Sequence, residues 1–174
     1  MSTSKLLRIG LVAAPFLAAA HMAWYYNALP EPVASHFGPT GAADGWMSRS
    51  AFAVSYVGVV LGMAALFGGT GWWLRRFPTS MINLPHRDFW LAPERREETL
   101  TSLGRRMSAI GLVTVAFLVV VFHLCLKANL DGTFRLGSGI GMALGLYLAV
   151  FLVWIIQLFI RYSRPPASSS PAGR

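Results

Sequence analysis

Residues 108–126 read SAIGLVTVAFLVVVFHLCL, and this stretch contains no Asp, Glu, Lys or Arg. A helix needs about 20 mostly apolar residues to cross the hydrocarbon layer of a membrane, so the stretch predicts one transmembrane helix. Three more stretches of this kind cover residues 9–26, 51–74 and 138–160. The fold class that we expect is therefore an all-α membrane protein, a four-helix transmembrane bundle.

The basic residues of the chain gather on one side of these four spans. Twelve of the fifteen Lys and Arg residues lie in the two tails or in the central loop, residues 75–107. The two other loops contain only Arg49, Lys127 and Arg135. The positive-inside rule then predicts a multi-pass plasma-membrane protein whose termini and central loop are cytoplasmic. The twelve are Lys5, Arg8, Arg75, Arg76, Arg87, Arg95, Arg96, Arg105, Arg106, Arg161, Arg164 and Arg174.

The composition of the chain agrees with a membrane protein and limits the kinds of partner that we expect. Apolar residues make up 55% of the 174 residues, and the formal net charge is +8. We attribute this charge to orientation and anionic lipid rather than to nucleic acid, because the basic residues flank the spans and Glu94, Glu97 and Glu98 interrupt them. A single cysteine, Cys125, excludes an internal disulfide and a site with several thiolates. The expected partner is thus the lipid bilayer, with no cofactor.

The chain divides at the span borders into four segments. Residues 1–50 hold the first span and an extracytoplasmic loop, and residues 51–107 hold the second span and the cytoplasmic loop. Residues 108–160 hold the third and fourth spans, and the short connection between them, with the turn pair Asp131 and Gly132, is expected to be a simple hairpin. Residues 161–174 are rich in Pro, Ser and Ala, and we expect a disordered cytoplasmic tail because few apolar residues are present to bury.

The start of the chain admits a second interpretation. Lys5 and Arg8, an apolar run and the small residues 18–20 also resemble a signal peptide cleaved before His21. The apolar run continues through Trp24, which favours an uncleaved first helix. The mass of the N-terminal fragment of the purified protein decides between the two.

Two spans carry glycines four residues apart, a spacing that lets helix backbones approach closely in lipid. The second span has Gly58 and Gly62, and the fourth has Gly137, Gly141 and Gly145. We expect these strips to pack the helices of one bundle together, with a homodimer face as the alternative. On the first interpretation, Gly141→Leu would destabilise the bundle.

The loop between the first two spans, residues 27–50, reads NALPEPVASHFGPTGAADGWMSRS. It has about 24 residues and no helix or strand pattern, and loops of this length are usually functional or disordered. Three prolines restrict its backbone, and Phe37 and Trp46 supply apolar anchors. We therefore expect an ordered loop that folds back over the bundle.

This loop also carries the residues of a known family. Its order LP, HF, G and DGW resembles the bacterial and archaeal membrane domain of unknown function numbered sixteen forty-eight, which also begins immunity proteins of the SdpI type. Gly38 stands where asparagine commonly follows HF in that family. A second segment, NLPHRDFWLAPERREETL in residues 83–100, is similar to one found in longer members. The matching loop residues are Leu29, Pro30, His36, Phe37, Gly41, Asp44, Gly45 and Trp46, with Arg49 where lysine is frequent.

The resemblance implies no enzymatic activity. The resemblance to proteins of the SdpI type implies protection against a membrane-active toxin. It also implies signalling in which a repressor is held at the membrane. The larger helical remainder of such proteins is absent from this chain, which weakens the inference of immunity.

Ionisable side chains gather near the expected outer face. His21 and His123 lie near the outer ends of two parallel spans and should share one depth, with His36 and Asp44 in the loop above them. Ionisable residues within a membrane are candidates for function. These four residues could bind a ligand or sense protons, or they could bind a metal ion. The alternative is loop architecture, in which Asp44 forms a turn with Gly45 and His36 bonds to the loop.

The central loop holds a second candidate surface. Pro93 begins an expected amphipathic helix that would lie on the membrane surface before the third span. The preceding residues are expected to be extended, and Asp88, Phe89 and Trp90 would anchor in headgroups or dock a cytosolic regulator or a membrane partner.

Three classes of function remain. An enzyme is least expected, because the chain has no nucleophile with a base at usable spacing, no phosphate loop and no HExxH motif. A small transporter or channel-like subunit acting as an oligomer is the alternative, although the spans contain no acid or base except two histidines. A non-enzymatic sensing, signalling or immunity-type module of the cell envelope fits best, with its oligomeric state open.

Overall fold

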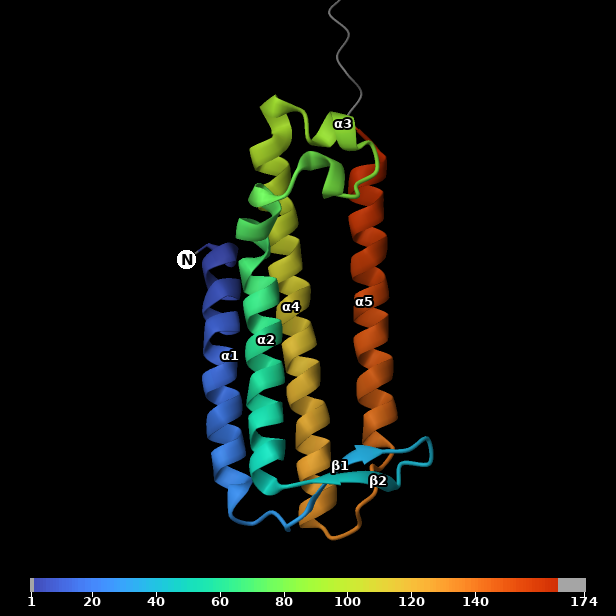
Figure 1. Ribbon diagram of the computed structural model, residues 1–174. Helices are drawn as coiled ribbons and strands as arrows, with labels where there is room; N and C mark the ends of the chain where they lie inside the picture. The colour runs from blue at the N-terminus through green and yellow to red at the C-terminus, as the bar shows by residue number, and fades with distance from the viewer. Residues whose placement is uncertain (1, 166–174) are drawn as a thin grey trace, which may run out of the picture.

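Four long helices form the body of the protein in the computed structural model, which describes residues 2–165 (Figure 1). Each is long and apolar enough to cross a membrane, which confirms the expected fold class. The predicted disorder of the tail falls mainly on residues 166–174, outside the described residues. The four helices are α1 (Thr3–Tyr26), α2 (Arg49–Arg76), α4 (Pro93–Leu130) and α5 (Gly139–Ser163).

The loop between α1 and α2 contains secondary structure that the sequence analysis missed. Strands β1 (Val33–Phe37) and β2 (Ala43–Met47) pair antiparallel into a hairpin, with irregular register around His36. The hairpin crosses the end of α4 (Figure 1). The alternation of apolar and polar side chains is too short and too irregular here to predict strands. We call this end of the molecule the hairpin end.

Helices α1, α2 and α4 pack side by side and form the larger core. The buried positions of α2 recur every fourth residue, at Phe52, Tyr56, Val60 and Ala64. This spacing places them on one face of the helix. Because lipid tails are as apolar as these side chains, the face is selected by close packing and dispersion rather than by exclusion of water.

Two glycines of α4, Gly104 and Gly111, lie directly against α2. A Cβ on Gly104 would lie 3.0 Å from the Cα of Gly71, and a Cβ on Gly111 would overlap the side chain of Phe67. Neither contact involves the glycine strips predicted from sequence. No atom lies within 4 Å of a Cβ built on Gly58, Gly62, Gly137, Gly141 or Gly145. The prediction that these strips pack the bundle is therefore wrong, because they face away from the other helices.

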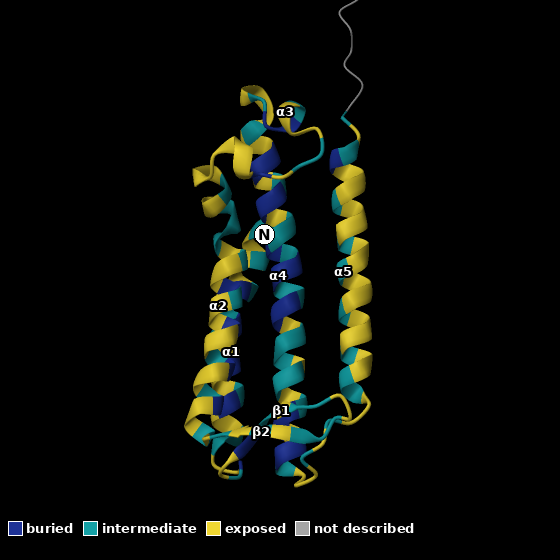
Figure 2. Cartoon of the chain, turned by 45° about the vertical axis from the view of Figure 1, so that its right-hand side comes forward, coloured by how far each residue is buried: buried dark blue, intermediate teal, exposed yellow. Residues whose placement is uncertain are grey.

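Helix α5 stands beside α4 and is exposed along most of its length (Figure 2). Half-buried positions recur at Tyr147, Phe151, Trp154 and Leu158, a stripe with helical spacing. Tyr147 stacks on Phe117 of α4 with ring centroids 4.4 Å apart. Aromatic side chains, rather than glycines, thus hold α5 against the bundle.

The central loop forms a compact cap at the other end of the molecule. It contains a short 3-10 helix η1 (Thr79–Met81) and the one-turn helix α3 (Arg87–Trp90). The expected extended segment is thus partly helical. Pro93 begins α4 as expected, but the amphipathic stretch continues straight into the span rather than lying apart on the membrane surface. We call this end the Trp90 end.

Candidate functional site at the hairpin end

The glycines of the family motif are explained by the backbone of the hairpin. Gly45 lies opposite His36, and a Cβ at Gly45 would come within 2.8 Å of the Cβ of His36. Gly41 has a φ of 77°, which favours glycine, and a Cβ there would lie 2.7 Å from the carbonyl oxygen of Leu136. The Leu136 N–H donates to the Gly41 carbonyl at 2.8 Å. These glycines therefore close the hairpin and seat it on the α4–α5 loop.

His36 and Asp44 face each other across the hairpin, and Nδ1 of His36 contacts a carboxylate oxygen of Asp44 on its exposed surface. Gly38 lies against this pair, since a Cβ at Gly38 would be 2.9 Å from a carboxylate oxygen of Asp44. An asparagine at this position would require Asp44 to shift, which gives a local reason for the departure from the family pattern. Both side chains stay open to a ligand approaching from outside the bundle.

The aromatic residues of the motif seat the hairpin on other elements. Phe37 packs against the larger core. Trp46 is exposed on one side and meets the ring of Phe134 at 5.0 Å between centroids. Phe134 belongs to the α4–α5 loop, whose Asp131 and Gly132 form the predicted turn. That loop also bridges Ala42 through Arg135, so it is more than a simple hairpin connection.

Asn129 fastens β1 to the end of α4. Its Oδ1 accepts from the Ala34 N–H at 2.8 Å, and its Nδ2 donates to the Ala34 carbonyl at 2.9 Å and the Cys125 carbonyl at 2.8 Å. Asn129 is 3% exposed, and Ala34 is fully buried. One side chain thus satisfies both peptide groups of a buried strand residue, which ties the hairpin to α4.

A polar cluster lies beneath the hairpin, among the apolar side chains of three helices. Nε2 of His21 is 3.2 Å from Nδ1 of His123, and Nδ1 of His21 is 3.0 Å from the Tyr56 hydroxyl. The rings of Tyr25 and His21 meet edge to face at 5.2 Å. The prediction that the two histidines share one depth is confirmed. We call His21, Tyr56 and His123 the histidine cluster.

The geometry of the histidine cluster limits its chemistry. When the Tyr56 hydroxyl donates to Nδ1 of His21, Nε2 of His21 carries the proton that faces His123. Two protonated rings would place like charges against each other, so the pair suits a single shared proton or one bound cation. His123 is exposed and His21 is half-buried, so the pair can be reached from the helix surface.

Few side chains of the candidate site could bind a metal ion together. Within residues 2–165, no three His, Cys, Asp or Glu side chains converge as a metal site. His21 and His123 offer two ring nitrogens, and His36 and Asp44 offer a nitrogen and a carboxylate on the outer surface. Cys125 is a free, buried thiol, as expected for a core residue.

The second candidate surface, in the central loop, is not assembled as predicted. Trp90 is 5% exposed, and its indole N–H donates to the Tyr162 carbonyl of α5 at 2.8 Å. Trp90 is therefore a core residue of the cap and does not reach the headgroups. Asp88 is almost fully exposed, and Phe89 is half-buried under Arg95. Of the three, Asp88 is the most accessible to a partner, and its carboxylate lies 3.6 Å from the guanidinium of Arg87.

Sequence reasoning missed several residues that organise these regions. Tyr56 is fully buried and Asn129 nearly so, but a single Tyr or Asn within or beside an apolar stretch gives no indication of its partner. Thr99 is another, since its hydroxyl donates to the Trp90 carbonyl at 2.8 Å. The asparagine three residues after the third span was the one available signal, because a polar amide that becomes buried there requires hydrogen-bond partners.

Comparison with known proteins gives one match. Residues 11–60 match the family described as Domain of unknown function (DUF1648). A search of the curated proteins and a search of the solved structures each found no match. The matched range stops before residues 83–100, where the second resemblance lies. The matched residues run from α1 through the hairpin into the first turns of α2, so this part of the chain is similar to that domain family.

Proposed function

We propose that this protein is a non-enzymatic sensing and signalling module of the cell envelope. The hairpin would face the outside and detect a ligand or a membrane-active molecule. The Trp90 end and both termini would face the cytoplasm of a plasma-membrane protein. The positive-inside distribution of Lys and Arg supports this orientation.

The observation that carries the proposal is the continuity of α4. This single helix of 38 residues, about 57 Å long, bears Asn129 at one end and Thr99 at the other. Asn129 holds the hairpin through Ala34, and Thr99 holds the cap through Trp90. A displacement of the hairpin would therefore move an element that also positions the cap.

The exposed residues of the hairpin suit recognition. His36, Asp44 and Trp46 offer a nitrogen, a carboxylate and an aromatic face on one fixed scaffold. Their backbone is held by Asn129 and by the α4–α5 loop, so a ligand would not have to order it. The histidine cluster lies directly below as a second responsive element.

A labelling experiment tests the coupling between the two ends. The single native cysteine is replaced by Cys125→Ala, and Asp88→Cys carries a spin label on the exposed cap. Asn129→Ala is then added to release the hairpin, and Asn27→Ala serves as a matched control at an exposed site. We expect the label at residue 88 to become more mobile with Asn129→Ala only. Identical spectra for the two variants would contradict the coupling.

A test in cells addresses the biological role. Cells that lack the protein should become more sensitive to membrane-active peptides, and the wild-type chain should restore resistance. His36→Ala and Trp46→Ala, present at wild-type levels, should not restore it. If cells with and without the protein are equally sensitive to these peptides, the proposed sensing and immunity roles are contradicted.

The transporter alternative is supported by one observation, the histidine cluster within the helix bundle. Transport would be favoured if wild-type proteoliposomes take up ions or protons and if His21→Ala and His123→Ala abolish this flux. Absence of flux in wild-type proteoliposomes, together with a sensitivity phenotype, would favour the sensing role.

A further inference from the structure

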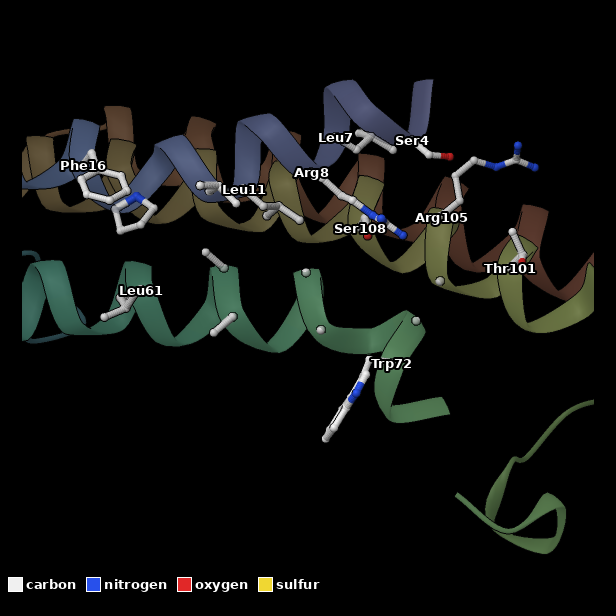
Figure 3. Close-up of a pocket in the computed structure, with 18 of the residues that line it drawn as sticks. Ser4, Leu7, Arg8, Leu11, Phe16, Leu61, Trp72, Thr101, Arg105 and Ser108 are labelled. Carbon is white, nitrogen blue, oxygen red and sulfur yellow. The ribbon is translucent and has the colours of Figure 1, made fainter. Parts of the chain in front are cut away.

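A groove of about 1000 Å³ opens between α1 and α2 and runs from Ser4 and Arg75, near the Trp90 end, past the middle of the bundle to Ala19 and Val57 (Figure 3). Helix α4 forms its floor, with Gly104 and Ser108 among the lining residues. Its size lies at the upper end of the roughly 300–1,000 Å³ that is usual for binding sites of small molecules. The groove is separate from the hairpin and from the histidine cluster.

The groove is apolar over most of its length. Leu11 and Phe16 of α1 line one wall, and Leu61 of α2 lines the other. The α2 wall continues in small residues, and a Cβ on Gly68 would meet only the end of Leu11, at 3.8 Å. The missing side-chain volume on α2 therefore leaves a channel wide enough for an alkyl chain.

The mouth of the groove is basic. Arg8 and Arg105 line it, and Figure 3 shows Arg8 reaching from α1 toward Ser108 of α4. Neither arginine has an ion-pair partner within the described chain, residues 2–165. A third lining arginine, Arg75, is already bound to Glu97 and Thr101. Two guanidinium groups thus remain available at one end of an apolar channel.

Both free arginines sit at the expected membrane border. Arg8 directly precedes the first apolar span, and Arg105 lies three residues before the third. This is the depth of lipid phosphates. Basic pockets between transmembrane helices at this depth bind anionic headgroups, and guanidinium groups bind phosphate by charge-assisted hydrogen bonds.

We propose that the groove binds one anionic phospholipid, with its phosphate between Arg8 and Arg105 and an acyl chain between α1 and α2. The lipid would fill the gap between these helices and join α1 to the base of α4. The net positive charge of the mouth selects a lipid that carries net negative charge over a zwitterionic one. A segment of a second copy would have to bring its own acidic group to this depth.

Native mass spectrometry of the full chain measures the binding. The protein is exchanged into detergent with phosphatidylglycerol or with phosphatidylcholine of the same acyl chains, and bound lipid is counted. We expect one tightly retained phosphatidylglycerol and weaker retention of phosphatidylcholine. Arg8→Gln combined with Arg105→Gln should weaken phosphatidylglycerol binding by roughly tenfold or more. Lys5→Gln combined with Arg164→Gln removes the same charge at the same end without touching the groove, and should bind like the wild type.

A second arm tests the apolar channel without changing charge. Gly68→Leu places a side chain in the groove and should also abolish retention of phosphatidylglycerol. Glycerophosphoglycerol, the headgroup without acyl chains, should not displace the lipid, which distinguishes a lipid site from a site for free phosphate. Circular dichroism of each variant checks that the helices are intact.

Three lipid-binding results would overturn the proposal. They are equal retention of the two lipids, wild-type binding by the double arginine variant, and displacement by glycerophosphoglycerol. A lipid-free dimer would also overturn it, because a second copy would then occupy the groove.

Discussion

At the residue scale, the family motif is a set of steric and hydrogen-bonding requirements of the hairpin. Gly41 and Gly45 stand where a Cβ would strike Leu136 or His36. Asn129 lies outside the matched range of residues 11–60 and nevertheless supplies the bonds that hold β1. The motif therefore describes the hairpin, whereas its support comes from a distant part of the chain.

Asn129→Ala should weaken the hairpin. The Ala34 N–H would be left buried without its partner, which costs about 1–3 kcal/mol. Hydrogen exchange of the β1 amides should accelerate, while exchange along α2 stays unchanged. Asn27→Ala is the matched control, because Asn27 is exposed at the end of α1. Equal exchange in the two variants would show that the hairpin does not depend on this side chain.

Gly45→Ala should also disturb the hairpin, by crowding rather than by loss of a bond. The added methyl would press on the Cβ of His36, and overpacking of this kind costs about 1–3 kcal/mol. We expect a lower melting temperature in detergent and faster proteolysis between β1 and β2. Gly137→Ala, where no atom lies within 4 Å, should leave both measurements at the wild-type values.

At the element scale, the helices use glycine and aromatic contacts that differ from those expected. Helix α2 packs directly against Gly104 and Gly111 of α4, whereas the glycine strip of α5 faces away from the bundle. Helix α5 relies instead on Tyr147 and Phe117, and on the Trp154 N–H, which donates to the Arg106 carbonyl at 3.2 Å. Glycines thus serve the contact between α2 and α4, and aromatic side chains serve the contact between α4 and α5.

A matched glycine pair tests this assignment. Gly111→Ala should destabilise the bundle by about 1–3 kcal/mol, because its methyl would overlap Phe67. Gly141→Ala makes the same change inside α5 in open space and should not destabilise it. Helix propensity rises in both variants, so it does not account for a loss of stability in either. Thermal unfolding in lipid nanodiscs measures the difference, and a larger loss with Gly141→Ala would restore the original prediction.

At the scale of the whole molecule, the two ends differ in construction. The hairpin end holds ordered strands, and the Trp90 end holds a cap built on the extension of α4, with Trp90 and Tyr162 at its centre. The cap projects beyond the start of α1 (Figure 1). Four apolar helices between two polar ends give the molecule the form of a multi-pass membrane protein.

Cysteine labelling tests the proposed orientation. In a Cys125→Ala background, Thr40→Cys on the hairpin should react with a membrane-impermeant maleimide in intact cells. Asp88→Cys in the cap should react only after the cells are permeabilised. The reverse labelling pattern would show that the protein has the opposite orientation in the membrane. Labelling of both sites in intact cells would contradict a bundle that spans the membrane.

The amino-acid sequence alone predicted the number of apolar spans, the start of α4 at Pro93, the turn at Gly132 and the resemblance of residues 11–60 to a domain family. These features are encoded locally, because a span needs a run of apolar residues and a tight turn needs particular residues in order. The packing of the helices alone shows which glycines meet a neighbour, that Trp90 is buried, and that His21 meets Tyr56 and His123. Such contacts join positions far apart in the chain, and composition and periodicity carry no information about which helix lies opposite.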